Sequence, residues 1–205
     1  MKRLKIPSLA ALALLFFTVS PMDAKAPKSS PALQTAILAG GCFWCMQPPF
    51  EHLTGVAEVL AGYTGGDGKN PTYEDYHEKG HTEAVQVKFD PSKISYAKLL
   101  DVYWRQINPT DPDGQFADRG PGYWAAIYYL NDEQKAEAEK SKAALGKSGK
   151  FDKPIMTKIL KAKFFTAAED YHQGYSHKNA MHYKLYKMGS GRESYLDGVW
   201  GAEGH

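Results

Sequence analysis

The chain has 205 residues, of which 43% are hydrophobic and 23% charged, the ordinary composition of a globular protein with one or two domains. This composition excludes a disordered, collagen-like or coiled-coil protein. Residues 1–26 carry four of the 25 Lys and Arg side chains and one of the 23 Asp and Glu side chains, so the rest of the chain has a net charge of −1. A nearly neutral chain lacks the basic footprint of a nucleic-acid-binding protein.

Residues 1–26 have the pattern of a secretory signal peptide. A basic start precedes an apolar stretch over residues 6–20 and a small-x-small sequence at residues 24–26. The apolar stretch is shorter than the roughly 20 residues of a membrane-spanning helix. We therefore expect cleavage after Ala26 and export to the periplasm. Because Pro27 disfavours that cut, an uncleaved leader that anchors the protein to the membrane is the alternative.

After the leader, short β-rich runs alternate with amphipathic segments. Residues 27–34 are rich in Pro, Lys and Ser and are interpreted as a flexible tether, so the folded domain is expected over residues 35–205. Ser95 and Asn131 are predicted N-caps, because an amphipathic run follows each of them. This alternation predicts one α/β or α+β domain with a mixed sheet, ending in a Gly-rich tail from residue 189 that has no predicted element. The expected strands span residues 36–39, 56–63, 82–89, 123–130 and 154–160, and the expected helices run from the two caps to residues 107 and 146.

Cys42 and Cys45 are the two cysteines of the chain and lie three residues apart. A disulfide between them closes too short a loop to staple a fold, so the pair is interpreted as chemical rather than structural. Gly40 and Gly41 allow a sharp turn into a predicted helix that starts at Cys42. A thiol in the first helical turn lies near unpaired N–H groups that favour its thiolate, so Cys42 is a candidate nucleophile. Cys45, one turn later, is placed to reach the Cys42 sulfur once that atom is oxidised.

The residues after the cysteines qualify this interpretation. Pro48 and Pro49 predict that the helix breaks after Gln47. The pair is also compatible with half of a zinc site or with an inert local disulfide. A zinc site needs two further ligands, and the histidines offer only a loose group: His172, His177 and His182.

Glu83 is the candidate proton donor. In the predicted strand 82–89, alternation places Glu83 on the same face as Val85, Val87 and Phe89. A carboxyl group on the core face is desolvated, which raises its pKa and lets it hold a proton. The alternative is a glutamate at the strand end that bends outward to solvent.

A long polar loop rich in Pro, Gly and Asp spans residues 108–123. Loops of this length inside a compact domain are more often functional than idle. Asp118, Arg119 and Tyr123 are its candidate contact residues. The turn at residues 62–66 presents Tyr63 in a similar way. Packing is the alternative role for each tyrosine, because the chain has 13 of them.

Five motifs together resemble the type A peptide methionine sulfoxide reductases. They occur in family order between about residues 35 and 200: Gly41-Cys-Phe-Trp-Cys45, Gly62-Tyr-Thr-Gly-Gly66, His81-Thr-Glu-Ala-Val-Gln-Val87, Gln115-Phe-Ala-Asp-Arg-Gly120 and Glu169-Asp-Tyr-His-Gln173. The resemblance implies a single compact two-layer α+β domain, with a mixed sheet flanked by helices around a ferredoxin-like core and with long irregular loops and a C-terminal tail. It also implies neither a metal nor a cofactor.

The resemblance implies a role for each candidate residue. Cys42 attacks the sulfoxide sulfur of the S epimer of methionine sulfoxide and becomes a sulfenic acid, while Glu83 protonates the oxygen. Tyr63 and Tyr123 match two phenols that hydrogen-bond this oxygen. Phe43 and Trp44 match an aromatic wall for the methyl group, and Asp118 matches a residue that orients the site.

Recycling is expected to differ from that of relatives with a distant C-terminal cysteine, because this chain has none. The resemblance implies that Cys45 resolves the sulfenic acid, giving a Cys42–Cys45 disulfide that an external thioredoxin-like dithiol reduces. The expected substrates are oxidised proteins or peptides and free methionine sulfoxide. The protein is expected to be a monomer that binds no nucleic acid and, once the leader is removed, no membrane.

Two other functions stay open on the sequence alone. An exported thiol–disulfide oxidoreductase of the thioredoxin type explains the cysteine pair, but it gives no role to Glu83 or to the 108–123 loop. A module that binds methionine-rich peptides through Phe43, Trp44 and Tyr123 gives no reason for paired thiols.

Overall fold

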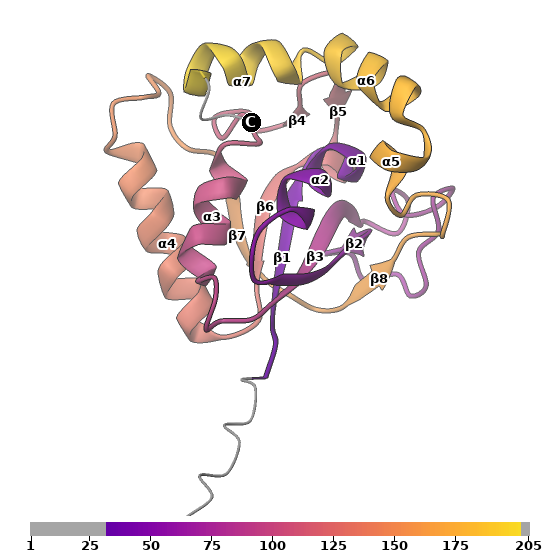
Figure 1. Cartoon of the computed structure of the whole chain (residues 1–205), viewed down its shortest axis with the longest axis horizontal. Coiled ribbons are helices and arrows are strands. Elements are labelled where there is room, and N and C mark those ends of the chain that lie inside the picture. Colours follow the sequence, from indigo (N-terminus) through magenta and orange to yellow (C-terminus); the bar gives the residue numbers. More distant parts are fainter. Residues whose placement is uncertain (1–31, 202–205) are drawn as a thin grey trace, which may run out of the picture. The chain divides into compact units, whose positions relative to one another are not determined.

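The computed structural model describes residues 32–201 of the chain (Figure 1). The predicted leader and the predicted tether up to residue 31 lie outside the described residues. Ala32 and Leu33 are exposed and lead into strand β1 (Gln34–Gly40), so the sheet begins one residue before the predicted domain boundary. Within the described range, no helix has the length and apolar character needed to cross a bilayer.

Six strands form the central sheet: β1, β2 (Val56–Thr64), β3 (Thr82–Phe89), β6 (Ala125–Tyr129), β7 (Lys158–Lys161) and β8 (Phe165–Ala167). Their order is β7-β6-β1-β3-β2-β8. The β6–β7 pair is parallel and the other four neighbouring pairs are antiparallel. The inner order β6-β1-β3-β2, with helical connections after β1 and β3, is the ferredoxin-like arrangement. The expected α+β domain with a mixed sheet is therefore confirmed.

Four helices contribute buried side chains to one face of this sheet: α1 (Phe43–Met46), α2 (Pro48–Glu51), α3 (Tyr96–Trp104) and α4 (Asp132–Gly146). Alternate strand residues meet them, and Leu38 of β1 lies opposite Val85 of β3 in the ladder. The residues between them, such as Ile37 and Ala84, belong to a smaller cluster on the opposite face. The main core therefore lies between the sheet and the helices, on the face toward which alternation directs Glu83.

Side-chain caps start α3 and α4 where the sequence predicts. Ser95 Oγ accepts a hydrogen bond from the Lys98 N–H at 3.1 Å, and Asn131 Oδ1 accepts one from the Gln134 N–H at 2.8 Å. Each such cap stabilises a helix by about 1 kcal/mol. The two caps therefore fix the beginning of both helices from local sequence.

Three predicted boundaries are wrong. The expected strand over 123–130 starts late, because Tyr123 belongs to the one-turn 3-10 helix η1 (Pro121–Tyr123), which turns the chain before β6 begins. The expected strand at 154–160 is shorter and shifts to β7. Helix α3 ends at Trp104, three residues before the predicted end at residue 107. The N–H groups of Arg105 and Gln106 donate to the carbonyls three residues before them, so the chain forms a tighter turn there.

The C-terminal segment forms α5 (Tyr175–Lys178), α6 (Ala180–Gly189) and α7 (Arg192–Trp200). Helix α7 lies in the tail from residue 189 that was expected to be irregular, so that expectation is wrong. Gly191, with a φ of 81°, lies between α6 and α7, so this glycine marks a turn between helices. The polar 108–123 loop contains a short hairpin of β4 (Gly114–Gln115) and β5 (Asp118–Arg119). Figure 1 shows α6 and α7 at the end of the domain where β4 and β5 also lie.

Candidate active site

The turn after β1 places the two cysteines. Gly41 has a φ of 79°, and a Cβ atom there would lie 2.6 Å from Cβ of Gln115, so the turn requires glycine. Cys42 is the N-cap of α1 and Cys45 lies within this one-turn helix. Both are free thiols, and they are 6% and 2% exposed. Pro48 starts α2, which confirms the predicted break at the prolines.

Glu83 points inward from β3, as alternation predicts, and is 2% exposed. Its Oε2 accepts a hydrogen bond from the Phe43 N–H at 2.9 Å, and its Oε1 accepts one from the Tyr76 hydroxyl at 3.0 Å. Burial raises the pKa of Glu83 to about 8, although both hydrogen bonds favour the charged form. The carboxyl group therefore holds a proton near neutral pH, and it is hydrogen-bonded to the helix that carries Cys45.

A small pocket of about 80 Å³ joins the nucleophile candidate to this acid. Drug-sized ligands occupy pockets of roughly 300–1,000 Å³, so this one suits the end of a single side chain. Six of its eight lining residues are predicted site residues, and Tyr73 and Tyr186 are additional. The lining residues are Cys42, Phe43, Trp44, Tyr73, Glu83, Asp118, Tyr123 and Tyr186.

Tyr63 does not line this pocket, contrary to the position expected for a phenol on the substrate oxygen. It is fully buried, and its hydroxyl donates to Glu169 Oε2 at 2.9 Å. Its ring stacks on Tyr76 with the ring centroids 4.9 Å apart. Tyr63 thus supports Tyr76, whose hydroxyl holds Glu83, and it does not face a substrate directly.

Tyr73 and Tyr186 also line the pocket, although no sequence pattern assigned either residue to the site. The Tyr73 N–H donates to Glu169 Oε1 at 3.0 Å, which fixes this loop next to β2. The Tyr186 hydroxyl donates to Asp118 Oδ2 and so links α6 to the hairpin. For Tyr73 the available signal was a tyrosine in a polar connection between two predicted strands. For Tyr186 there was none, because its segment had no predicted element.

The C-terminal segment also builds the aromatic wall of the pocket. The Trp44 indole N–H donates to His172 Nδ1 at 3.1 Å, and the Trp44 ring stacks on Tyr175 at 3.8 Å with 7° between the planes. His172 is 1% exposed, and burial lowers its pKa, so the ring is neutral. The wall is therefore held by packing and one hydrogen bond between α1 and residues more than 120 positions later.

The surroundings of the two thiols differ from the predicted ones. Burial raises the pKa of Cys42 well above its ordinary value, and the hydrogen bond with Cys45 and the charge of Glu83 act in the same direction. The same hydrogen bond lowers the pKa of Cys45 to about 7, against the effect of burial. The short helix therefore does not make Cys42 a thiolate, and Cys45 is the more readily ionised thiol of the pair.

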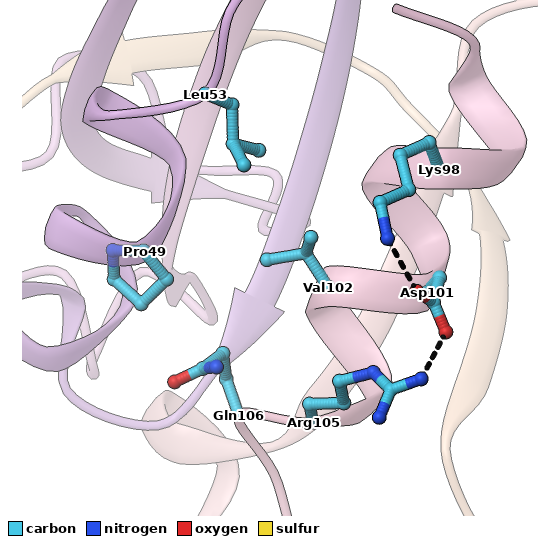
Figure 2. Close-up of a pocket in the computed structure, with 7 residues that line it drawn as sticks. All are labelled: Pro49, Leu53, Lys98, Asp101, Val102, Arg105 and Gln106. Atoms are coloured by element: carbon cyan, nitrogen blue, oxygen red, sulfur yellow. Dashed lines mark hydrogen bonds and ion pairs between the residues drawn. The ribbon is translucent and has the colours of Figure 1, made fainter. Parts of the chain in front are cut away.

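A larger hollow of about 440 Å³ lies between α2 and α3 (Figure 2). Its charged side chains pair with one another, because Lys98 and Arg105 both bond to Asp101 at 2.9 Å. None of the seven residues that line it is a cysteine or a histidine. Its size alone therefore does not make it the site of thiol chemistry.

The zinc alternative gains no support from the neighbours of the cysteines. Among residues 32–201, the group of metal-ligating side chains whose donor atoms lie within 4.8 Å of one another is Glu51, His52 and His177, which includes neither thiol. His177 Nε2 lies 3.1 Å from Glu51 Oε2 as an ordinary polar pair. In this described part of the chain, the cysteines are thus not assembled with histidines into a zinc site.

Comparison with known proteins identifies relatives that span this whole domain. The family model described as peptide methionine sulfoxide reductase matches residues 34–203. The peptide methionine sulfoxide reductase MsrA of Bacillus velezensis is 54% identical over 169 residues, which cover 82% of this chain and 96% of the relative. The segment matched by the family model, residues 34–203, therefore includes every residue that lines the small pocket.

Solved structures agree with this assignment. Mxr1 from Saccharomyces cerevisiae in reduced form matches with a TM-score of 0.68 and 28% identity, over 76% of this chain and 91% of that chain. The same yeast protein in complex with Trx2 matches with a TM-score of 0.51 and 25% identity, over 74% of this chain and 91% of that chain. Because the family model and the curated relatives match almost the whole described domain and the solved structures share its fold, the chain belongs to the family of type A peptide methionine sulfoxide reductases.

Proposed function

We propose that this enzyme reduces the S epimer of methionine sulfoxide, protein-bound and free, with Cys42 as nucleophile and Glu83 as proton donor. The observation that carries the proposal is that the Cys42 thiol and the buried Glu83 carboxyl group, whose pKa is raised by burial, line one pocket large enough for a methyl sulfoxide group. The Cys42 sulfur attacks the sulfoxide sulfur while the Glu83 proton moves to the sulfoxide oxygen.

The atoms and electrons of this step balance. The attack forms a bond between the Cys42 sulfur and the substrate sulfur. The protonated oxygen then moves to Cys42, so the substrate S–O bond is replaced by a Cys42 S–O bond. The bond between the two sulfurs breaks, methionine leaves with its electron pair, and Cys42 is left as a sulfenic acid. The Cys42 thiol proton returns to Glu83, whose carboxylate is meanwhile held by the Phe43 N–H and the Tyr76 hydroxyl. The sulfoxide gains two electrons and the thiol loses two.

The pocket offers a separate environment for each substituent on sulfur. Phe43 and Trp44 provide an aromatic wall for the methyl group, and Tyr123 provides a phenol near Glu83 for the oxygen. Tyr73 takes the second phenol position that the sequence assigned to Tyr63. A chiral sulfur centre with three distinct substituents then fits the pocket in one configuration, which is the basis for selecting the S epimer.

The remaining steps regenerate the thiols. Cys45 attacks the sulfenic acid, the Cys42–Cys45 disulfide forms and water leaves. An external thioredoxin-like dithiol then reduces the disulfide. Support for such a partner comes from the complex of the related yeast Mxr1 with Trx2. The enzyme is proposed to act on oxidised proteins and peptides as a monomer, with Asp118, held by Tyr186, orienting the substrate backbone.

The test measures methionine formed from the separate S and R epimers of a sulfoxide peptide with excess dithiothreitol. We expect turnover of the S epimer alone, loss of activity in Cys42→Ser, and a decrease of about 10²- to 10⁴-fold in Glu83→Gln, the usual contribution of a general acid. Glu58→Gln is the matched control, because Glu58 is an exposed surface glutamate paired with Lys88. Disulfide reduction in a protein substrate without methionine from either epimer would instead assign the enzyme to the thioredoxin-type oxidoreductases.

Cys45→Ser tests the resolving step in the same assay. We expect one methionine per enzyme at the wild-type rate, followed by slow turnover that depends on direct reduction of the sulfenic acid. A trap for sulfenic acids should label Cys42 in this variant and not in the wild type. Full steady-state activity in Cys45→Ser contradicts the proposed disulfide.

We also propose that residues 1–26 direct export and are removed after Ala26. The mass of the protein recovered from fractionated cells tests this step. A periplasmic protein that begins at Pro27 supports it, a membrane-bound protein with an intact leader supports the anchored alternative, and an intact cytoplasmic protein refutes both.

A further inference from the structure

Arg192 is a buried cation next to the cysteine turn. It is the first residue of α7 and is 1% exposed. Its guanidinium donates to the Gly40 carbonyl at 2.8 Å and to the Gln106 carbonyl, and it lies 4.6 Å from the centre of the Phe116 ring. Within residues 32–201, each partner recorded for this guanidinium is neutral.

The position of the guanidinium brings it against both ends of the cysteine segment. Its Nη1 lies 3.8 Å from Met46 Sδ, directly after Cys45, and a Cβ atom on Gly41, directly before Cys42, would lie 3.0 Å from its Nη2. An arginine keeps its charge at any pH relevant to proteins. An unpaired buried charge is strongly unfavourable, so a negative charge that forms near the Arg192 guanidinium is stabilised by it.

We infer that Arg192 is a positioning residue that supplies the counter-charge for the Cys45 thiolate, both when Cys45 attacks oxidised Cys42 and when the disulfide is reduced. This inference rests on the proposed function. In the first step the Cys45–Cys42 sulfur–sulfur bond forms, the Cys42 S–O bond breaks, and the leaving oxygen takes up protons and departs as water. In the second step a dithiol thiolate bonds to the Cys42 sulfur, and Cys45 leaves with the electron pair of the broken bond.

Other titratable and charged groups also act on Cys45, and they come from β3, β5 and α6 as well as α7. Charge on Asp118 opposes ionisation, whereas Lys187 acts with Arg192 to lower the pKa of Cys45. Lys187 is only partly buried, so solvent and salt screen it more than they screen Arg192. The groups facing Cys45 are Cys42, Glu83, Asp118, Tyr183, Lys187 and Arg192.

The first experiment titrates the Cys45 thiolate by its absorbance at 240 nm, in full-length protein with Cys42→Ser, so that one thiol remains. We expect Arg192→Gln to raise the midpoint by about one pH unit or more, which is a tenfold loss of thiolate below the midpoint. Arg192→Lys keeps the charge and should hold the midpoint within about half a unit. Arg105→Gln is the control, because Arg105 packs over the Trp200 ring of the same helix α7.

Thermal unfolding separates this role from a structural one. A lower Tm in Arg192→Gln with an unchanged midpoint overturns the inference. If Arg192→Gln does not fold, Arg192→Lys decides the question, because an ammonium cannot reproduce both carbonyl hydrogen bonds but keeps the charge. If Arg192→Lys lowers the Tm and also raises the midpoint of the Cys45 titration, the inference is overturned as well.

The second experiment follows one turnover without reductant in the two-cysteine enzyme. Arg192→Gln should slow disulfide formation about tenfold more than methionine formation below the Cys45 midpoint, and the difference should disappear as the pH rises above it. Equal slowing of both steps at every pH overturns the inference. If the wild type forms no methionine, the proposed function fails, whereas the titration still measures the pairing of Arg192 with Cys45.

Discussion

Replacing Glu83 by glutamine should change how stability depends on pH. The folded pKa of about 8 is raised above the ordinary value of 4.5 by burial. Below pH 4.5 both the folded and the unfolded states hold this proton, so the stability contribution is fully present there. Between the two values the unfolded chain releases the proton while the folded chain keeps it, so the free energy of unfolding falls as the pH rises.

The structure sets the size of this effect. One pKa unit corresponds to about 1.4 kcal/mol, so the wild type should lose about 4 kcal/mol relative to Glu83→Gln between pH 5 and pH 8. Glutamine has the shape of the acid and no titration. Its carbonyl can accept from the Phe43 N–H, and its amide can donate to the Tyr76 hydroxyl oxygen, so both hydrogen-bonding positions stay occupied.

Urea unfolding of both proteins under reducing conditions, at each pH from 5 to 8, measures this difference. The other titrating groups, such as His172, occur in both proteins and cancel in the comparison. Glu58→Gln is the control for the loss of a glutamate from the same sheet, because Glu58 is exposed and pairs with Lys88 on the surface. If the free energies of unfolding of the wild type and Glu83→Gln change in parallel with pH, Glu83 is already ionised at neutral pH. Its role as proton donor would then lose its basis.

The remaining predictions concern the neighbours of this acid, the aromatic wall and one helix cap. Tyr76→Phe removes the hydroxyl that donates to Glu83 at 3.0 Å, a bond of about 1.5–3 kcal/mol to the charged form, so the alkaline limb of the kcat/KM profile should move up by about one to two pH units. Trp44→Ala should lower kcat/KM for the sulfoxide peptide about 10- to 200-fold, the usual range for one methyl-sized contact, and Trp44→Phe should retain most of the activity. Asn131→Ala should lower the free energy of unfolding by about 1 kcal/mol in urea titrations, with activity unchanged.

Local patterns predicted the residues whose environment is set by their own strand or turn. The inward position of Glu83 follows from alternation with Val85 and Val87, and the break after α1 follows from the chemistry of proline. Alternation could not show which phenol reaches the pocket, because Tyr63 is the last residue of the predicted strand 56–63 and Tyr73 lies in a polar connection with no predicted element. Tyr63 even lies opposite Glu83 in the β2–β3 ladder, yet its hydroxyl is directed to Glu169. Which phenol reaches the pocket depends on how the connection between β2 and β3 folds back.

The contributions of the C-terminal segment had no local signal at all. Tyr186 lies 68 positions after Asp118, and Arg192 lies 152 positions after Gly40. The Gly-rich sequence from residue 189 is typical of an irregular tail. The glycine at 191 instead forms the turn that lets α7 return toward β1. Only the folded arrangement shows that this segment places a phenol on Asp118 and a cation beside the Gly40 carbonyl.

The arrangement of the two thiols also limits the order of events in catalysis. Cys42 lines the pocket, whereas Cys45 lies behind it and is 2% exposed. In the proposed cycle the reductant attacks the Cys42 sulfur in the same pocket that holds the sulfoxide, so we expect methionine to leave before reduction begins. Steady-state kinetics with varied sulfoxide and varied dithiol protein should give parallel double-reciprocal lines, with the sulfoxide competing against the reductant at high concentration. Intersecting lines would require both molecules to be bound at once and would contradict this order of events.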